Sequence, residues 1–281
     1  MNDNLIKKHA KSFYWASFFL SREVFFKCSV LYNFCRVLDD IVDSAEDLSV
    51  KKVKFLKFKN EFLKKNFDNQ VIKEMWDIVN SENISKIIVQ DLFDGVETDL
   101  KEKVKINSKK DLIIYSYRVA GTVGLMMSKI LKVNNKESLK GAISLGIAMQ
   151  FTNIARDIIE DKELNREYIN HDFLSLKNII YDAEILYDSS FLAIKGIPIR
   201  SRFSVIVARR IYRKIGYYIL KKKNIEKYNK AGKIFVPVEA KIIETFFSML
   251  DFCKLFFIRN NNYTNNNHEL LIQEINLNER I

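Results

Sequence analysis

Residues 145–169, LGIAMQFTNIARDIIEDKELNREYI, carry a polar stripe on a segment that otherwise has the apolar pattern of a buried helix. Asn153, Asp157 and Asp161 follow one another at intervals of four residues, so an α-helix places their side chains on one face. Gln150 precedes Asn153 by three residues and joins the edge of that face. A helix with amide and carboxylate oxygens on a face that should be apolar either packs against a charged partner or binds a ligand.

A second acidic cluster lies in residues 31–43, LYNFCRVLDDIVD. Asp39 and Asp43 share one helix face, and Asp40 lies about 100° around the helix from Asp39. Like charges four residues apart repel each other on a helix, so something must offset that cost in this apolar segment. Arg36 could do so by pairing with Asp39 or Asp40, which is the purely structural alternative to ligand binding.

The two clusters together predict a metal-dependent site for a diphosphate. Their donors are oxygens only, which suits a hard cation, Mg²⁺ with Mn²⁺ as an alternative. Mg²⁺ prefers one or two carboxylates together with phosphate oxygens of a substrate. The chemistry that follows is ionisation: metal ions and arginines stabilise the leaving diphosphate while an apolar cavity holds the carbocation. Aromatic residues, 12% of the chain, could line that cavity or simply form the core.

The composition indicates an all-α protein built as one large domain. The chain has 281 residues but only 2 prolines and 8 glycines, too few for the turns of a β-sandwich or barrel. Hydrophobic residues make up 48% and charged residues 29%, which excludes a mostly disordered chain. Helical periodicity predicts helices near 9–20, 22–46, 51–66, 70–79, 83–101, 110–131, 136–162, 178–193, 200–221 and 237–257.

The net charge of +11 suggests a polyanion, an anionic membrane or a phosphorylated substrate without choosing among them. Residues 51–65 carry seven lysines and predict an amphipathic helix. Its basic face is either solvated or in contact with a membrane or nucleic acid, and its apolar residues are Val53, Leu56, Phe58 and Phe62. No nucleic-acid-binding motif accompanies the charge, so we expect no nucleic-acid partner. A second basic stretch, 221–233, is predicted to be a loop.

We place the domain at 1–258 and an Asn-rich tail at 259–281, predicted to be a loop or disordered apart from a possible short helix at 268–277. Three cysteines without metal-ligand spacing indicate a reduced, intracellular protein. The N-terminal residues lack an apolar signal core, and the longest uncharged run, 15 residues, is too short to span a bilayer. We expect a cytoplasmic protein, with peripheral contact to the inner membrane left open.

Two glycines interrupt the apolar helix YRVAGTVGLMM, residues 117–127. Each of Gly121 and Gly124 costs about 1 kcal/mol of helix stability relative to Ala. Close helix packing and room for a substrate beside the backbone both account for them, and the sequence leaves the two open.

The sequence resembles the squalene/phytoene synthase family of head-to-head prenyltransferases. The matching stretches occur in the family's order and are HAKSFYWAS (9–17), LYNFCRVLDDIVD (31–43), DLFDGVETDL (91–100), YRVAGTVGLMM (117–127), LGIAMQFTNIARDIIEDKELNREYI (145–169) and GIPIRSRFSVIVARRIYRKI (196–215). The resemblance implies a single-domain isoprenoid synthase bundle of helices around a central cavity.

The resemblance also implies roles for individual residues. It implies Mg²⁺ ligands at Asp39, Asp43, Asn153 and Asp157, with Asp40 and Asp161 completing the two acidic motifs. It implies contacts to the diphosphates or prenyl chains for His9, Lys11, Ser12, Phe13, Ser17, Tyr32, Arg36, Gln150, Arg156, Arg166, Tyr168 and Tyr228. Tyr32 and the aspartates of both motifs are the implied catalytic residues.

The sequence departs from the family pattern at two places, neither of them a metal ligand. The family usually has proline after the RxY element, where this chain has Asn170. It often has arginines where this chain has Gly232 and Lys233, and a lysine supplies charge without a bidentate fork.

Among family members, a phytoene synthase fits best, with two C20 substrates and no NADPH. Phe13 and Ser17 share a helix face, and Ser17 leaves room for a longer chain if that face lines the prenyl pocket. The alternatives are a dehydrosqualene or squalene synthase with C15 substrates, or a non-catalytic relative in assembly or lipid binding. Squalene synthase needs NADPH, and this chain has no glycine-rich dinucleotide fingerprint. The sequence leaves open the oligomeric state and the group that accepts the proton.

Overall fold

The computed structural model describes residues 6–8, 10–258 and 266–281, and they fold almost entirely into helices. The helices are α2 (Lys11–Ser17), α3 (Arg22–Asp43), α4 (Leu48–Leu63), α5 (Gln70–Ser81), α6 (Lys86–Glu97), α7 (Lys109–Ser116), α8 (Thr122–Ile130), α9 (Lys136–Glu163), α10 (Phe173–Phe191), α11 (Ile199–Leu220), α12 (Ile225–Lys230), α13 (Val238–Phe257) and α14 (Asn266–Ile275). The predicted all-α fold is confirmed.

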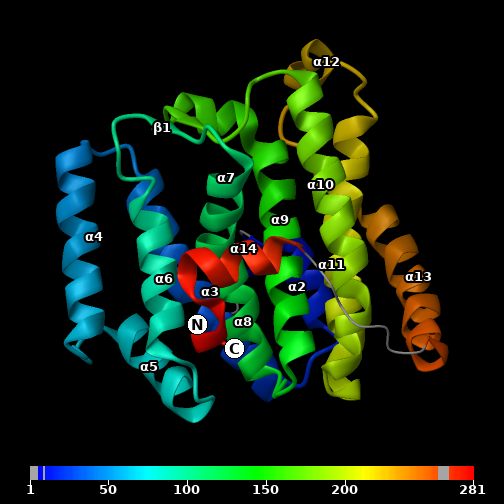
Figure 1. Ribbon diagram of the computed structural model, residues 1–281, viewed down its shortest axis with the longest axis horizontal. Helices are drawn as coiled ribbons and strands as arrows, with labels where there is room; N and C mark the ends of the chain where they lie inside the picture. The colour runs from blue at the N-terminus through cyan, green and yellow to red at the C-terminus, as the bar shows by residue number, and fades with distance from the viewer. Residues whose placement is uncertain (1–5, 9, 259–265) are drawn as a thin grey trace.

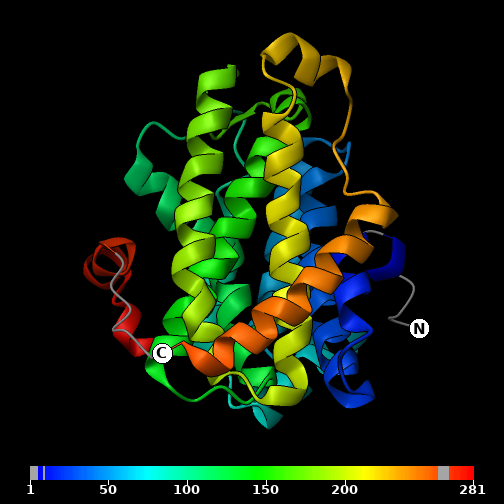
Figure 2. The same cartoon turned by 90° about the vertical axis from the view of Figure 1, so that its right-hand side faces the viewer.

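Helix α9 runs through the middle of the bundle (Figures 1 and 2). It packs against α8, α10 and α11, and against the π-helix η1 (Tyr117–Gly121). Asn135 starts α9 as an N-cap, because its side chain accepts a hydrogen bond from the backbone of Ser138 at 2.8 Å. This central position brings the polar stripe of 145–169 into the interior of the bundle.

Gly121 and Gly124, in the segment before α9, allow close packing. A Cβ added to Gly124 would lie 2.4 Å from the carbonyl oxygen of Ala142 on α9. One added to Gly121 would lie 2.9 Å from the ring of Tyr117. The helix predicted at 110–131 is interrupted by η1, because five residues there adopt π-helical turns between α7 and α8. Such bulges are frequent at functional sites.

A cluster of aromatic side chains fills the core beside α4. Phe34 packs against Phe58, Phe62 and Phe93 with ring centroids 5.4 to 5.8 Å apart. The lysine-rich segment 51–65 forms the predicted amphipathic helix, but part of its apolar face was assigned wrongly. Val53 and Leu56 are exposed, and the large ring of Phe55 is buried with Phe58 and Phe62.

Other segments also differ from the sequence prediction. The basic stretch 221–233 contains the short helix α12, whose N-cap Asn224 accepts a hydrogen bond from the backbone of Lys227. The start of the Asn-rich tail lies outside the described residues. Its later part is not a loop, because it forms α14, as the short-helix alternative allowed, and then the 3₁₀ turn η3 (Leu277–Glu279). Within the described residues, no helix has the length and apolar composition needed to cross a bilayer.

The only strands of the described chain form a two-stranded parallel ladder, β1 (Val104–Lys105) and β2 (Arg166–Glu167). Val104 pairs with Arg166 in this register. The ladder fixes the backbone that follows α9 against the segment that follows α6. It therefore sets the position of Arg166 at the end of the bundle where α3 and α9 also end.

Candidate active site

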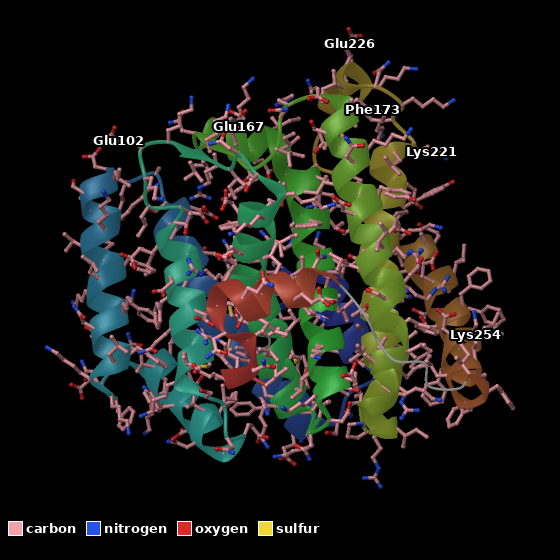
Figure 3. The ribbon with its side chains drawn as sticks, viewed as in Figure 1. Glu102, Glu167, Phe173, Lys221, Glu226 and Lys254 are labelled. Carbon is pink, nitrogen blue, oxygen red and sulfur yellow. The ribbon has the colours of Figure 1, made fainter. Side chains whose placement is uncertain are left out.

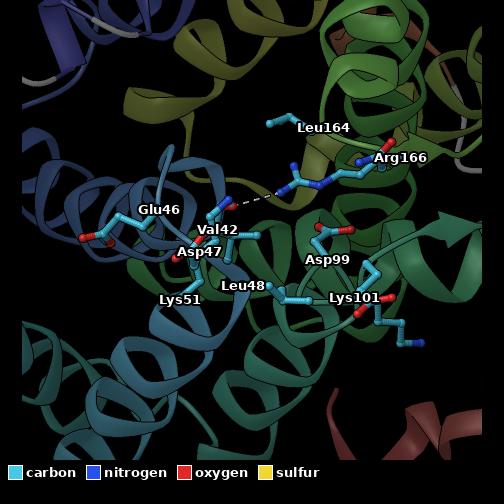
Figure 4. A pocket seen from close by; sticks show the side chains of 11 residues that line it. Val42, Glu46, Asp47, Leu48, Lys51, Asp99, Lys101, Leu164 and Arg166 are labelled. Carbon is cyan, nitrogen blue, oxygen red and sulfur yellow. Dashed lines mark hydrogen bonds between the residues drawn. The ribbon is translucent and has the colours of Figure 1, made fainter.

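The two acidic clusters meet at Arg166. The guanidinium donates to Asp43 Oδ1 at 2.7 Å and to the carbonyl of Val42 at 3.2 Å, so a residue just after α9 binds the last turn of α3 (Figure 4). Arg166 is almost fully buried, with 9% of its surface exposed. The charge of Asp43 also acts on Asp161 of α9 and raises its pKa. The two predicted clusters therefore lie close enough for the charge of Asp43 to act on Asp161.

Crowding of carboxylates marks this site electrostatically. Burial, followed by the charge of Asp43, raises the pKa of Asp39 to about 7. Burial, followed by the charge of Asp157, raises the pKa of Asp161 to about 8. Although many protein atoms surround it, Asp39 is exposed. A cation bound beside these carboxylates would favour their ionised forms.

Basic side chains already pair with several of the aspartates. Arg36 pairs with Asp40 at 2.5 Å, which is one of the two pairings expected from the sequence. Arg156 holds both oxygens of Asp157, at 2.8 and 2.5 Å. Lys233 also lies 3.2 Å from Asp157, so this lysine points at the acidic cluster although the family often has arginine nearby. The site thus brings cations and carboxylates together in one place.

The donor set suits a hard divalent cation. Asn153 Oδ1 is buried without a hydrogen-bond partner, while its amide nitrogen donates weakly to Gln150 at 3.4 Å. A buried oxygen without a hydrogen-bond partner is expected where a metal ion is the partner. Among the described residues, no group of three or more Asp, Glu, His or Cys side chains is gathered tightly enough to hold a metal by itself. The oxygen donors of the two clusters fit Mg²⁺, which commonly takes further ligands from substrate phosphates.

A buried triad of Asp99, Tyr115 and Tyr168 lies beside the carboxylates. Tyr115 and Tyr168 both donate to Asp99, at 2.8 and 2.7 Å, and their rings stack with centroids 4.8 Å apart. Burial raises the pKa of Asp99, and its charge raises the pKa values of Asp39 and Asp161. Tyr168 was predicted as a site residue, whereas Asp99 and Tyr115 were missed. Asp99 lies within the stretch 91–100 and Tyr115 lies just before 117–127, and both stretches carry the family resemblance, which was the available signal.

The predicted residues of the first helix approach the site through Tyr212 of α11. The ring of Phe13 lies 4.8 Å from that of Tyr212. Burial raises the pKa of Tyr212, and the charges of Arg156 and Asp157 also act on it, so this tyrosine adjoins the acidic stripe of α9. Tyr32 adjoins the other cluster, because Asp39 and Arg36 are among the charges that act on it.

The remaining predicted residues are less directly placed. Lys11 is exposed, and Ser12 is partly exposed. Ser17 is partly exposed and donates to the carbonyl of Tyr14 at 2.7 Å. Tyr228 is buried and donates to the carbonyls of Ala155 and Arg156, so it fixes α12 to the middle of α9. His9 lies outside the described residues.

Two pockets open on either side of Arg166. One, of about 400 Å³, is lined by Val42, Lys51, Asp99 and Arg166 among others (Figure 4). The other, of about 360 Å³, is lined by Asp161, Arg166 and Tyr168 together with the apolar Ile154 and Ile158. Both lie at the end of the bundle that carries the acidic clusters.

A stripe along α9 connects the acidic end with an apolar interior. Ala142, Leu145, Met149 and Asn153 follow at helical spacing and stay partly accessible, although other helices pack around α9. The partly accessible stripe is apolar along its first turns and polar where Asn153 and Asp157 lie. Such a site can hold a diphosphate at one end and a hydrocarbon chain along the other.

Comparisons with known proteins agree with this arrangement. A family profile described as squalene/phytoene synthase matches residues 6–179. A 15-cis-phytoene synthase from Pantoea ananas is 27% identical over 257 residues, which cover 77% of this chain and 83% of that protein. The crystal structure of a dehydrosqualene synthase superposes with a TM-score of 0.74 at 24% identity, covering 90% of this chain and 95% of that one. A squalene synthase from Alicyclobacillus acidocaldarius gives a TM-score of 0.66 at 18% identity, over 79% and 92%.

The profile covers more than half of the chain, and its span includes both acidic clusters, Arg166 and the Asp99 triad. The chain belongs to the squalene/phytoene synthase family of head-to-head prenyltransferases.

Proposed function

We propose that this protein is a phytoene synthase that joins two geranylgeranyl diphosphates head to head, as a step of carotenoid biosynthesis. The observation that carries the proposal is the meeting of α3 and α9 at Arg166, where two acidic clusters stand at the end of a partly accessible, otherwise apolar stripe. The relationship to a 15-cis-phytoene synthase over most of both chains supports the choice of product.

The proposed reaction has two stages, and each releases one diphosphate and one proton. In the first, the C–O bond of one substrate breaks, and the double bond of the other captures the allylic cation to give a cyclopropyl diphosphate. In the second, that intermediate loses its diphosphate and rearranges to phytoene. No reductant is consumed, so we expect no requirement for NADPH.

The residues of the chain fit the first bond cleavage. Asp39, Asp43, Asn153 and Asp157 would hold Mg²⁺, or Mn²⁺ in its place. A divalent cation held there would neutralise charge that develops on the departing diphosphate. Arg166 adds a guanidinium whose fork matches phosphate oxygens, and it is held in place by the ladder of β1 and β2.

The interior of the bundle would protect the carbocation from water. Leu145 and Met149 lie on the accessible stripe of α9 below Asn153, and they present hydrocarbon rather than nucleophilic atoms. The triad of Asp99, Tyr115 and Tyr168 holds its hydroxyl protons in fixed hydrogen bonds beside the carboxylates. These hydrogen bonds fix the orientation of the polar groups beside the carboxylates.

The second candidate is a dehydrosqualene or squalene synthase that uses two farnesyl diphosphates. The fold is shared with a dehydrosqualene synthase, so the frame alone does not choose C20 over C15 substrates. The C20 proposal depends on the depth of the prenyl pocket near Phe13 and Ser17. A Ser17→Phe variant would shorten that pocket, and we expect its preference to move from C20 toward C15 diphosphates.

The test is to incubate purified protein with Mg²⁺ and either prenyl diphosphate, with and without NADPH, and to identify the product by chromatography and mass spectrometry. We expect phytoene from geranylgeranyl diphosphate at a rate that NADPH does not change. A C30 product formed faster from farnesyl diphosphate would replace the proposal with the second candidate. No hydrocarbon from either substrate would refute both.

A further inference from the structure

Helix α13 has its polarity reversed relative to a surface helix of a globular protein. The side that faces the bundle includes Lys241, Glu244 and Ser248, all buried. The side that faces outward is mostly apolar, with Glu239 and Lys254 as its exposed charged residues. It exposes Val238, Ile242, Ile243, Phe246, Phe247, Met249, Leu250, Phe256 and Phe257, each with 42–86% of its surface accessible. A helix that covers a soluble core normally shows the opposite arrangement.

Ion pairs fix this orientation. Arg210 of α11 donates to Glu244 at 2.9 Å and to Asp251 at 2.7 Å, and Lys214 lies 3.0 Å from Glu244. Trp15 of α2 also donates to Thr245 at 3.0 Å. Rotating α13 to bury its apolar side would break these contacts and leave charged groups of α11 unpaired. The outward apolar face is therefore held in place by the fold.

The apolar face continues onto neighbouring elements. Ring contacts lead from Phe256 through Phe252 and Phe203 to Phe19, with centroids 4.8 to 6.0 Å apart. Phe18, beside Phe19, is 64% exposed. Figure 2 shows α13 lying across the outside of the bundle over α11. Monomeric soluble proteins rarely expose so continuous an apolar surface without using it for binding.

Exposed lysines lie in the segment that leads into α13. Lys221, Lys223, Lys227 and Lys230, before α13, are exposed, and none forms an ion pair with another described residue. Figure 3 places Lys221 and Lys254 along the edge of the molecule that α13 occupies. An apolar helix face with Lys254 near its end and exposed lysines in the segment before it matches the hydrocarbon and the anionic headgroups of a membrane surface.

We propose that the outward face of α13, extended by Phe18 and Phe19, docks this protein on an anionic lipid bilayer, with the helix lying in the plane of the interface. A second copy of the chain fits less well, because a two-fold contact through this face would bring one basic end against another. The docking proposal rests on the proposed function in one respect. The substrates and product of such an enzyme carry long hydrocarbon chains, which explains why it would bind a membrane.

The test compares three forms of the full chain in co-sedimentation with vesicles of phosphatidylcholine, with or without phosphatidylglycerol. One variant combines Phe246→Gln, Leu250→Gln and Phe257→Gln. The matched control combines three exposed apolar residues of the lysine-rich helix α4, Val53→Gln, Leu56→Gln and Leu63→Gln. We expect binding to the anionic vesicles to fall by at least about tenfold in the α13 variant and by less than about twofold in the α4 variant. Equal binding by wild type and the α13 variant, or loss in the α4 variant instead, would overturn the proposal.

Cys253 provides an independent reporter, because it is exposed on α13 among the outward residues. An environment-sensitive fluorophore on Cys253 should shift to shorter wavelength on anionic vesicles but not on neutral ones. A dimer in solution that the α13 substitutions dissociate, together with no vesicle binding by wild type, would assign the face to a second copy and refute the membrane.

Activity on detergent-dispersed substrate separates this proposal from the proposed function. The α13 variant should keep wild-type activity there, because its substituted residues face away from the site. Vesicle binding by a protein that makes no hydrocarbon would refute the proposed function and leave the docking face in place. Product formation without vesicle binding would do the reverse.

Discussion

Replacing Arg280 should destabilise the whole fold, although Arg280 lies far along the chain from its partners. The guanidinium forms a bidentate pair with Asp91 of α6, at 2.7 and 3.0 Å, and Asp91 accepts a further hydrogen bond from Tyr117 at 3.0 Å. The side chains of Arg280 and Asp91 are only 10% and 8% exposed. The pair therefore joins the segment after α14 to α6 and to the first residue of η1.

An Arg280→Met variant keeps the hydrophobic part of the side chain but leaves the carboxylate of Asp91 buried without its cation. Breaking a buried pair in this way costs about 3 kcal/mol of unfolding free energy. The assay is urea denaturation followed by circular dichroism, for Arg280→Met, Asp91→Asn and the double variant. We expect the double variant to lose less than the sum of the two single losses, because the pair is a single interaction.

Glu279→Gln is the matched control, because Glu279 lies 3.7 Å from the same arginine but is 61% exposed. Its loss should stay below about 0.5 kcal/mol. A loss below about 1 kcal/mol for Arg280→Met, or additive losses in the double variant, would refute the reasoning that the end of the chain clamps η1.

Three further predictions concern separate parts of the fold. Burial lowers the pKa of His268 from 6.5 to about 4, so its stabilisation is present above pH 6.5 and is lost as the pH falls toward 4. The free energy of unfolding should therefore differ by about 2 kcal/mol between pH 7 and pH 5, and His268→Asn should remove that difference. Gly124→Ala should cost about 1–3 kcal/mol because its Cβ would meet the oxygen of Ala142, whereas Gly232→Asn, which points into open space at φ +62°, should cost less in the same melting experiment. A thiol reagent should modify Cys253 in the native protein much faster than the other two cysteines, whose pKa values burial raises; equal rates would contradict the packing described.

The acidic stripes could be predicted because they depend on local spacing. Four-residue intervals put Asp39 beside Asp43, and Asn153 beside Asp157, as soon as the segments are helical. That the two stripes meet at Arg166 could be expected only from the resemblance, because Arg166 and Asp43 are 123 positions apart in the sequence.

The triad around Asp99 could not be found from spacing. Tyr115 and Tyr168 lie 16 and 69 residues from Asp99 and come together only through tertiary packing. Which apolar residues of α4 are buried could not be predicted for a different reason. The segment offers two apolar arcs, and the bulky ring of Phe55 is buried in preference to Val53 and Leu56.

Helix α13 shows where a general rule misleads. The periodicity of 237–257 predicts the helix, and the usual rule would turn its apolar arc inward. The orientation is decided instead by Arg210, which pairs with carboxylates on the other arc. A one-dimensional pattern does not contain that pairing, because the cation comes from another helix.

The central claim is that α3 and α9 together form one site that cleaves a prenyl diphosphate. It is tested most directly by the rate of diphosphate release from geranylgeranyl diphosphate with Mg²⁺, for wild type, Asp39→Asn, Asp157→Asn and the exposed control Asp94→Asn. Either site variant should release diphosphate at least about a hundredfold more slowly while its melting curve stays cooperative, and Asp94→Asn should keep the wild-type rate. Wild-type diphosphate release by the folded Asp39→Asn or Asp157→Asn protein would contradict it.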